Sequence, residues 1–258
     1  MDTQIPLLTY LQTALPRLPK TPLPERDHFP TDDYNPTAIT TTTPWTDFTL
    51  TTILARYGDV LRNARIQSDP FASSPPRSIL CYSVLRARVW DFVHPRVRRG
   101  LRCGIEYLST DGEQAGMVPL CFDIDADDKK AHTPDAGYFD SRALVGEAPN
   151  RAPGVYVPSW VWGSDMVTAA AEGEDEAGEN AKAMYYAVLS RVAFYMEENG
   201  AKYGFVLTDE ELVVVRLGGR LGEMEVGESV KWGVGGSDEE PVMTVLLGLW
   251  YLGMIASE

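Results

Sequence analysis

Residues 133–162 read "TPDAGYFDSRALVGEAPNRAPGVYVPSWVW". Its apolar runs are short and are separated by Gly, Asp and Pro, which favour turns over continued helix. We therefore expect two short strands, over residues 135–142 and 154–162. Because successive strand residues point to opposite faces, the side chains of Val155 and Val157 should point the same way.

Helical patterns precede and follow this stretch. Apolar residues recur every three or four positions over 47–66, which is typical of an amphipathic helix with Thr51 or Thr52 as its cap. Residues 78–94 are a second predicted helix. A long helix is expected to follow the charge run 172–180 over residues 181–200, where Gly200 closes it.

The other predicted elements are mostly strands. We expect strands over 101–110 and 116–125, a hairpin over 203–217 with its turn at 208–210, a weaker strand over 223–232, and a buried terminal helix over 242–257. Strands, one long helix and then more strands indicate an α/β fold with a mixed central sheet flanked by helices.

Composition limits the classes of function. The chain has 258 residues, with 37 acidic against 23 basic side chains and a formal net charge of −14, which argues against general nucleic-acid binding. Its three cysteines are far apart, so neither a disulfide framework nor a zinc site is expected. The N-terminus lacks a signal-peptide pattern and residues 242–257 are too short to span a bilayer. We therefore expect an intracellular protein, cytoplasmic or nuclear, with no membrane contact.

Residues 1–48 differ in composition from the rest. They contain a short apolar segment, then many prolines, and then a threonine run. Proline removes a backbone donor and discourages both helix and sheet. We therefore expect a Pro/Thr-rich N-terminal extension that wraps on the surface or stays mobile, followed by one domain over residues 49–258.

The pair Pro134-Asp135, followed twenty positions later by Val155 and then by "PSWVW", resembles the core of the PD-(D/E)xK nuclease-like domains found in many fungal proteins. The phrases "VLSRVAFYM", "KYGFVLTDEELVVVR" and "PVMTVLLGLWYLGMIAS" are similar to the helix, hairpin and closing helix of that group, so the resemblance covers roughly residues 50–258. It implies a restriction-endonuclease-like fold.

The resemblance also implies where a metal site would lie. In the family, an Asp after Pro and an Asp/Glu-x-Lys on the neighbouring strand converge, so that two carboxylates hold Mg²⁺ while the Lys stabilises charge. Here Asp135 matches the first acid, but Val155 stands at the second acid and Val157 at the Lys. Many members carry Gln-x-x-x-Tyr on the next helix, and the matching residues are Arg191 and Tyr195.

These departures predict loss of the cutting reaction. Valine offers no oxygen to a hard cation, so Asp135 alone would be a weak Mg²⁺ ligand and no cofactor is expected. Arg191 brings a permanent cation that would oppose a metal and would pair with Asp135. The chain is therefore expected to be an inactive nuclease-like domain that acts as a binding or regulatory protein. If the resemblance is misleading, both valines are ordinary core residues and Asp135 is a turn residue.

Two other functions stay open. One is an active Mg²⁺-dependent DNA nuclease in which other acids, such as Asp123, Asp125 or Asp140, have taken over the ligand role. The other is a structural or oligomerising module that forms homo-oligomers.

One basic concentration stands out in this acidic chain, and it comprises Arg86, Arg88, His94, Arg96, Arg98, Arg99 and Arg102. If these side chains share a face, they are expected to bind a nucleic-acid backbone, an acidic protein partner or the chain's own segment 172–179. The alternative is a set of scattered surface arginines.

Overall fold

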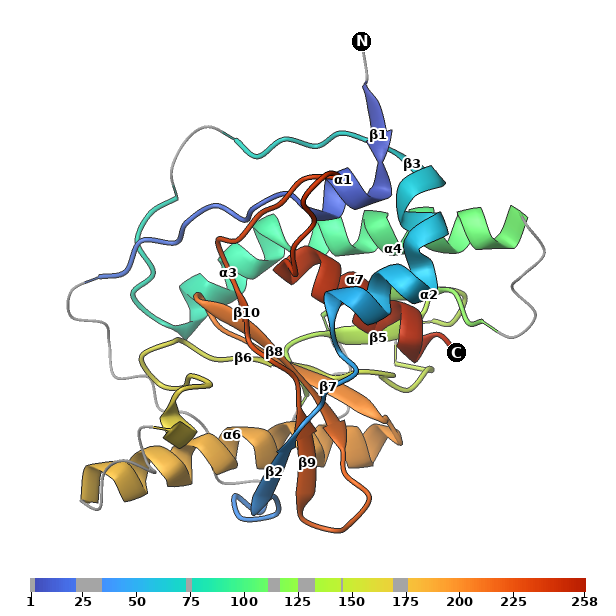
Figure 1. Ribbon diagram of the computed structural model, residues 1–258. Coiled ribbons are helices and arrows are strands. Elements are labelled where there is room, and N and C mark those ends of the chain that lie inside the picture. Colours follow the sequence, from blue (N-terminus) through green and yellow to red (C-terminus); the bar gives the residue numbers. More distant parts are fainter. Residues whose placement is uncertain are drawn as a thin grey trace.

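A mixed sheet of six strands organises the molecule in the computed structural model, which describes residues 3–21, 34–72, 76–110, 117–124, 133–144, 146–168 and 176–258 (Figure 1). In spatial order, its strands are β2 (Thr41–Pro44), β9 (Glu223–Val226), β8 (Glu211–Leu217), β7 (Tyr203–Leu207) and β6 (Gly154–Tyr156), and β10 (Val230–Lys231) also pairs with β8. The outer pairs β2–β9 and β6–β7 are parallel, whereas β7–β8 and β8–β9 are antiparallel.

Two smaller antiparallel pairs accompany this sheet. Strand β4 (Leu120–Asp123) pairs with β5 (Gly137–Asp140), and β1 (Gln4–Pro6) pairs with β3 (Arg65–Gln67). An isolated bridge between Ala136 and Gly154 joins the start of β5 to β6. This bridge brings the segment that contains Asp135 to the edge of the main sheet.

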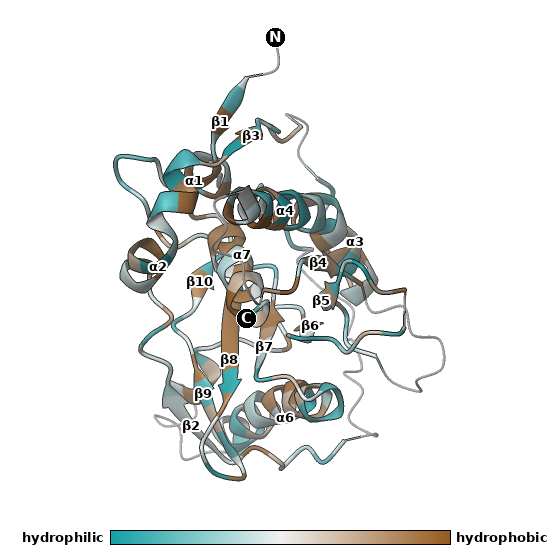
Figure 2. Ribbon diagram, turned by 90° about the vertical axis from the view of Figure 1, so that its right-hand side faces the viewer, coloured by the Kyte–Doolittle hydropathy of each residue, from teal (hydrophilic) through white to brown (hydrophobic). Residues whose placement is uncertain are grey.

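Helices cover both faces of the main sheet. One face packs on α6 (Glu176–Asn199). The helices of the other side are α1 (Leu7–Leu11), α2 (Leu50–Asn63), α3 (Tyr82–Phe92), α4 (His94–Thr110) and α7 (Val245–Ala256) (Figures 1 and 2). The expected mixed sheet flanked by helices is therefore confirmed.

The sequence of strand β8 is continuously apolar because both faces of the strand are covered by helices. Leu212 and Val214 pack toward α7, while Val213 and Val215 pack toward α6, and all four are fully buried. A strand covered on both faces needs apolar side chains at every position rather than at alternate ones. The predicted hairpin over 203–217 is confirmed, with its turn at 208–210.

Helix α7 lies at the centre of the fold. Each of its residues is buried, and Figure 2 shows its hydrophobic ribbon between α4, α2 and the sheet. The Thr244 hydroxyl caps its first turn by accepting the Leu247 amide at 3.1 Å. The predicted buried terminal helix is confirmed. No helix within the described part of the chain is both long and apolar enough to cross a membrane.

The strand predicted over residues 101–110 is wrong, because these residues belong to the helix α4. The buried face of α4 carries Val97, Leu101, Ile105 and Leu108, which recur at four, four and three positions. The glycines of α4 have a packing role, since a β-carbon on Gly104 would lie 3.0 Å from the Trp250 ring.

The described residues of the segment 1–48 contribute several side chains to the core and are not only a surface arm. Leu7, Leu11 and Leu15 are at most 4% exposed, and the Leu11 carbonyl accepts the Thr244 hydroxyl at 2.6 Å. Strand β2 lies within the main sheet, and Trp45 behind it is 5% exposed. The proline-rich residues 22–33 lie outside the described residues.

The start of α2 differs from the predicted cap, and the end of α6 agrees with the predicted one. Helix α2 is capped by Thr49, whose hydroxyl accepts the Thr52 amide, rather than by Thr51 or Thr52. Helix α6 ends at Asn199, and Gly200 follows with a φ of +60°, which glycine adopts without the strain that other residues meet.

Candidate functional site

Asp135 lies beside β6, as the spacing of the motif predicts. The amides of Asp135 and Ala136 both donate to the Gly154 carbonyl, at 2.9 and 3.3 Å. Two consecutive residues that face one residue of the partner strand form a β-bulge, which bends the chain and redirects side chains. The fold therefore positions the Asp135 carboxylate at the edge of the main sheet, between α3 and α6.

The Asp135 carboxylate is buried and fully engaged. It is 5% exposed, and its Oδ2 accepts the Tyr156 amide at 2.8 Å. Its Oδ1 accepts the Tyr82 hydroxyl and lies 3.5 Å from Arg86 Nε. Burial raises the pKa of Asp135, and this effect is opposed by the hydrogen bonds and by the charges of Arg191 and Arg86. Both carboxylate oxygens thus already have partners within the chain.

The two valines of the motif are core residues. Val155 and Val157 are fully buried and belong to the cluster that packs beneath α6. Neither offers an atom that binds a hard cation.

Arg191 brings a positive charge close to Asp135 from α6. Its Nε donates to the Tyr195 hydroxyl at 3.4 Å, and its guanidinium lies 5.7 Å from the centre of that ring. The charge of Arg191 lowers the pKa of Asp135, so the two groups interact. Tyr195 is 2% exposed and its pKa is raised, chiefly by burial.

Among the residues that the structure describes, no other acid completes a metal site with Asp135. Asp123 binds Arg98 at 2.9 Å, Asp140 binds Arg142 at 2.7 Å, and Asp125 lies outside the described residues. Across the described ranges, no group of three or more His, Cys, Asp or Glu side chains is arranged to hold a metal ion. Two guanidinium groups and a phenol around one buried carboxylate do not fit Mg²⁺, which requires oxygen ligands.

The arginine cluster runs along α3 and α4, and its charges are compensated within the chain. Arg88 pairs with Asp91, Arg98 with Asp123, Arg102 with Glu106, both Arg96 and Arg99 with Asp69, and Arg86 with Asp135. Arg96 is 6% exposed and its guanidinium stacks 3.6 Å from the Phe71 ring centre, so it presents almost no surface to a partner. The remaining five arginines do not form a uniform basic face.

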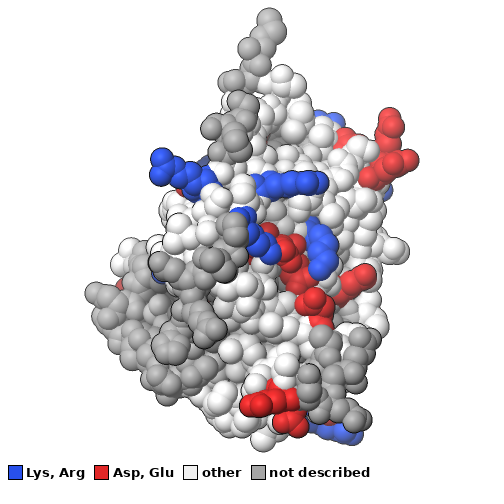
Figure 3. Space-filling model, turned by 90° about the vertical axis from the view of Figure 1, so that its left-hand side faces the viewer, with Lys and Arg blue, Asp and Glu red and all other residues white. Residues whose placement is uncertain are grey.

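Charges of both signs also lie side by side in the space-filling view (Figure 3).

His94 is a neutral core residue, and grouping it with the cationic cluster was wrong. Its ring packs against Trp90 and Phe122 at centroid distances of 4.8 and 4.6 Å, and its Nε2 is 2.7 Å from the Tyr156 hydroxyl. Burial, followed by the charges of Arg98 and Arg86, lowers the pKa of His94 to about 3. The sequence contained one signal of this role. His94 follows Trp90 by four residues, a spacing that places two rings next to each other on a helical surface.

A pair of carboxylates at the β7–β8 turn was also missed. Asp209 accepts the amide and the hydroxyl of Ser159 at 2.7 and 2.8 Å. Glu211 does the same for Ser164 at 2.6 and 2.9 Å, and it also binds Lys231 at 2.5 Å. These bonds hold the loop after β6 against the hairpin, and Trp162 within this loop is fully buried.

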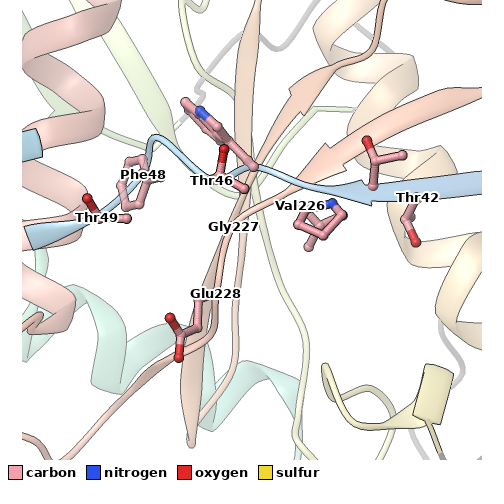
Figure 4. A pocket seen from close by; sticks show the side chains of 10 residues that line it. Thr42, Thr46, Phe48, Thr49, Val226, Gly227 and Glu228 are labelled. Carbon is pink, nitrogen blue, oxygen red and sulfur yellow. The ribbon is translucent and has the colours of Figure 1, made fainter.

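Two open pockets lie away from Asp135. One of about 490 Å³ lies between the residues after β2 and the loop after β9, and Figure 4 shows Phe48, Thr46 and Glu228 among its lining residues. Another of about 500 Å³ lies where α6 and α7 end, near Lys202 and Arg151. Neither pocket is lined by Asp135 or by the residues that contact it.

The chain matches no protein-family model, no curated protein and no solved structure in the comparisons made.

Proposed function

We propose that the chain is a nuclease-like domain that has lost its metal site and works within the cell as a binding or regulatory protein. The observation that supports this proposal most is the burial of the Asp135 carboxylate. It is 5% exposed and accepts hydrogen bonds from the Tyr156 amide and the Tyr82 hydroxyl. A divalent ion would have to displace these donors and approach two guanidinium groups.

The position of the motif supports the proposed restriction-endonuclease-like relationship. Asp135 adjoins β6 through its bond to Gly154, as the family pattern requires of the first acid and the strand that carries the second. Where the second acid and the Lys are expected, two fully buried valines stand instead. A motif that keeps its position in the fold while its metal-binding residues are replaced is consistent with a domain retained for binding.

Calorimetric titration of the whole chain with Mg²⁺ and with Mn²⁺ tests the proposal. We expect no binding heat in the micromolar range and no cleavage of plasmid DNA when either metal is supplied. Asp135→Asn preserves the size of the side chain, and Asp140→Asn is a matched control at an acid that is 24% exposed and paired with Arg142. Micromolar metal binding that Asp135→Asn abolishes and Asp140→Asn retains, or cleavage that a chelator stops, would refute the proposal.

A further inference from the structure

An aromatic and cationic stripe runs along one side of α3, from the half-buried Tyr82 to the exposed Trp90. Tyr82, Arg86 and Trp90 follow one another at intervals of four residues, so their side chains are neighbours on one side of the helix. Arg98 of the next helix extends the stripe, since its guanidinium lies 5.9 Å from the centre of the Trp90 ring.

Arg86 presents an open donor fork at one point of this stripe. Its Nε lies 3.5 Å from Asp135 Oδ1, and its guanidinium lies 5.7 Å from the Tyr82 ring centre, so the group is held in place. The side chain is 46% exposed, and its two terminal nitrogens have no hydrogen-bond partner among the described residues. A planar guanidinium with both terminal nitrogens open binds a carboxylate with two parallel hydrogen bonds.

Trp90 supplies an apolar surface one helical turn away. Its side chain is 44% exposed, which makes it one of the few large apolar residues of the described chain on the surface. The ring rests on His94 at 4.8 Å and is therefore supported from below. A tryptophan that is rigidly backed and open on its outer side is a favourable anchor for a protein partner.

The charges of the surrounding arginines favour a peptide over a nucleic-acid backbone. Arg88, Arg99 and Arg102 are paired with acids at 3.4, 3.1 and 2.7 Å. Arg98 is held by Asp123 at 2.9 Å and by the Phe122 carbonyl at 3.3 Å. A phosphate backbone needs several unpaired cations, whereas one open fork beside one indole matches one carboxylate beside one large apolar side chain.

We propose that Arg86 and Trp90 form a docking site for a peptide segment that carries an Asp or Glu next to an aromatic or large aliphatic residue. The carboxylate binds the Arg86 fork and the apolar side chain covers the Trp90 indole. This inference rests on the proposed binding function and names the class of partner.

Selection of randomised twelve-residue peptides displayed on phage, against the whole chain, tests the docking site. We expect the recovered peptides to share an acidic residue next to a large apolar one. The best peptide, labelled with fluorescein, should bind at least about ten-fold more weakly to Arg86→Lys and to Trp90→Ala when its affinity is measured by anisotropy. Arg88→Lys is the matched control, because Arg88 is on the same helix and its charge is taken up by Asp91; its affinity should be unchanged.

Urea unfolding of each variant shows whether the fold is kept, and Arg86→Lys retains a positive charge next to Asp135. No recovered peptides, peptides without acidic residues, or equal binding to Arg86→Lys and the unchanged chain would overturn the docking site. Binding of a labelled single-stranded DNA that depends on Arg86 and Trp90 while the peptides fail would also overturn it. Metal binding at Asp135 is measured separately, so failure of the docking site is distinguishable from failure of the proposed function.

Discussion

Replacement of His94 by Gln should remove a large part of the acid sensitivity of the fold. In the folded chain the pKa of His94 is about 3, against an ordinary value of 6.5, because the imidazole is buried next to two arginines. Below pH 6.5 the unfolded chain takes up a proton that the folded chain does not. The stability contributed by a neutral His94 is therefore complete above the unfolded pKa and is lost progressively as the pH falls toward 3.

The size of this effect follows from the two pKa values. Between pH 7 and pH 5 the protonation of the unfolded histidine lowers the free energy of unfolding by about 2 kcal/mol, since each pH unit below the unfolded pKa is equivalent to about 1.4 kcal/mol. In His94→Gln the side-chain amide still reaches the Tyr156 hydroxyl but does not titrate. The difference in unfolding free energy between the two proteins should thus shift by about 2 kcal/mol between pH 7 and pH 5.

Urea unfolding at both pH values, followed by circular dichroism, measures this double difference. Groups that titrate identically in both proteins cancel, including Asp135, whose pKa is raised by burial and whose contribution has the opposite sign. Equal pH dependence in the two proteins would refute the reasoning, as would a nuclear magnetic resonance titration in which the His94 ring protonates near pH 6.

Three further substitutions test the packing and the hydrogen bonds. Glu211→Gln should lower the free energy of unfolding by about 2 kcal/mol in urea melts at pH 7, because a 5% exposed carboxylate loses its bond to Lys231. The control Glu210→Gln changes a 57% exposed side chain and should alter this free energy by less than about 0.5 kcal/mol. The pKa of Glu211 is lowered, so its contribution is present above the ordinary value of 4.5 and should fade as the pH drops through the folded pKa; a difference that persists at pH 3 would contradict this. Gly154→Ala should cost about 3 kcal/mol, because its β-carbon would overlap an aromatic ring of β7, while Gly219→Ala, with nothing within 4 Å, should be nearly neutral by thermal unfolding. Thr49→Ala removes the cap of α2 and should cost about 1 kcal/mol, and an unchanged unfolding midpoint would show that the cap contributes nothing.

Elements defined by local patterns were predictable from the sequence. The hairpin of β7 and β8 and the terminal helix follow from short-range apolar patterns and turn residues, and the end of α6 follows from Gly200. Helix α4 was mistaken for a strand because Gly100 and Gly104 interrupt its apolar face. Those glycines instead allow close packing of Trp250, whose indole nitrogen donates to the Gly100 carbonyl at 3.0 Å.

The site was only partly predictable, because its partners are distant in the sequence. The motif predicted that Asp135 lies next to β6, which it contacts at Gly154 and Tyr156, and the interaction with Arg191 was also expected. The Tyr82 hydroxyl, however, reaches Asp135 from 53 residues away, and Ser159 binds an acid 50 residues further on. Contacts of this kind depend on how helices pack across the sheet, which apolar periodicity alone does not determine.

The central position of α7 has a consequence for synthesis on the ribosome. Its residues 245–256 contact α1 as well as α4, so segments that are far apart in the sequence must meet before either is sheltered from water. Pairing of segments with such a large sequence separation slows folding and delays it until α7 has been synthesised. Nascent chains halted ahead of Thr244 should therefore remain sensitive to protease, and chaperones would be needed to keep the unfinished apolar surfaces from aggregating.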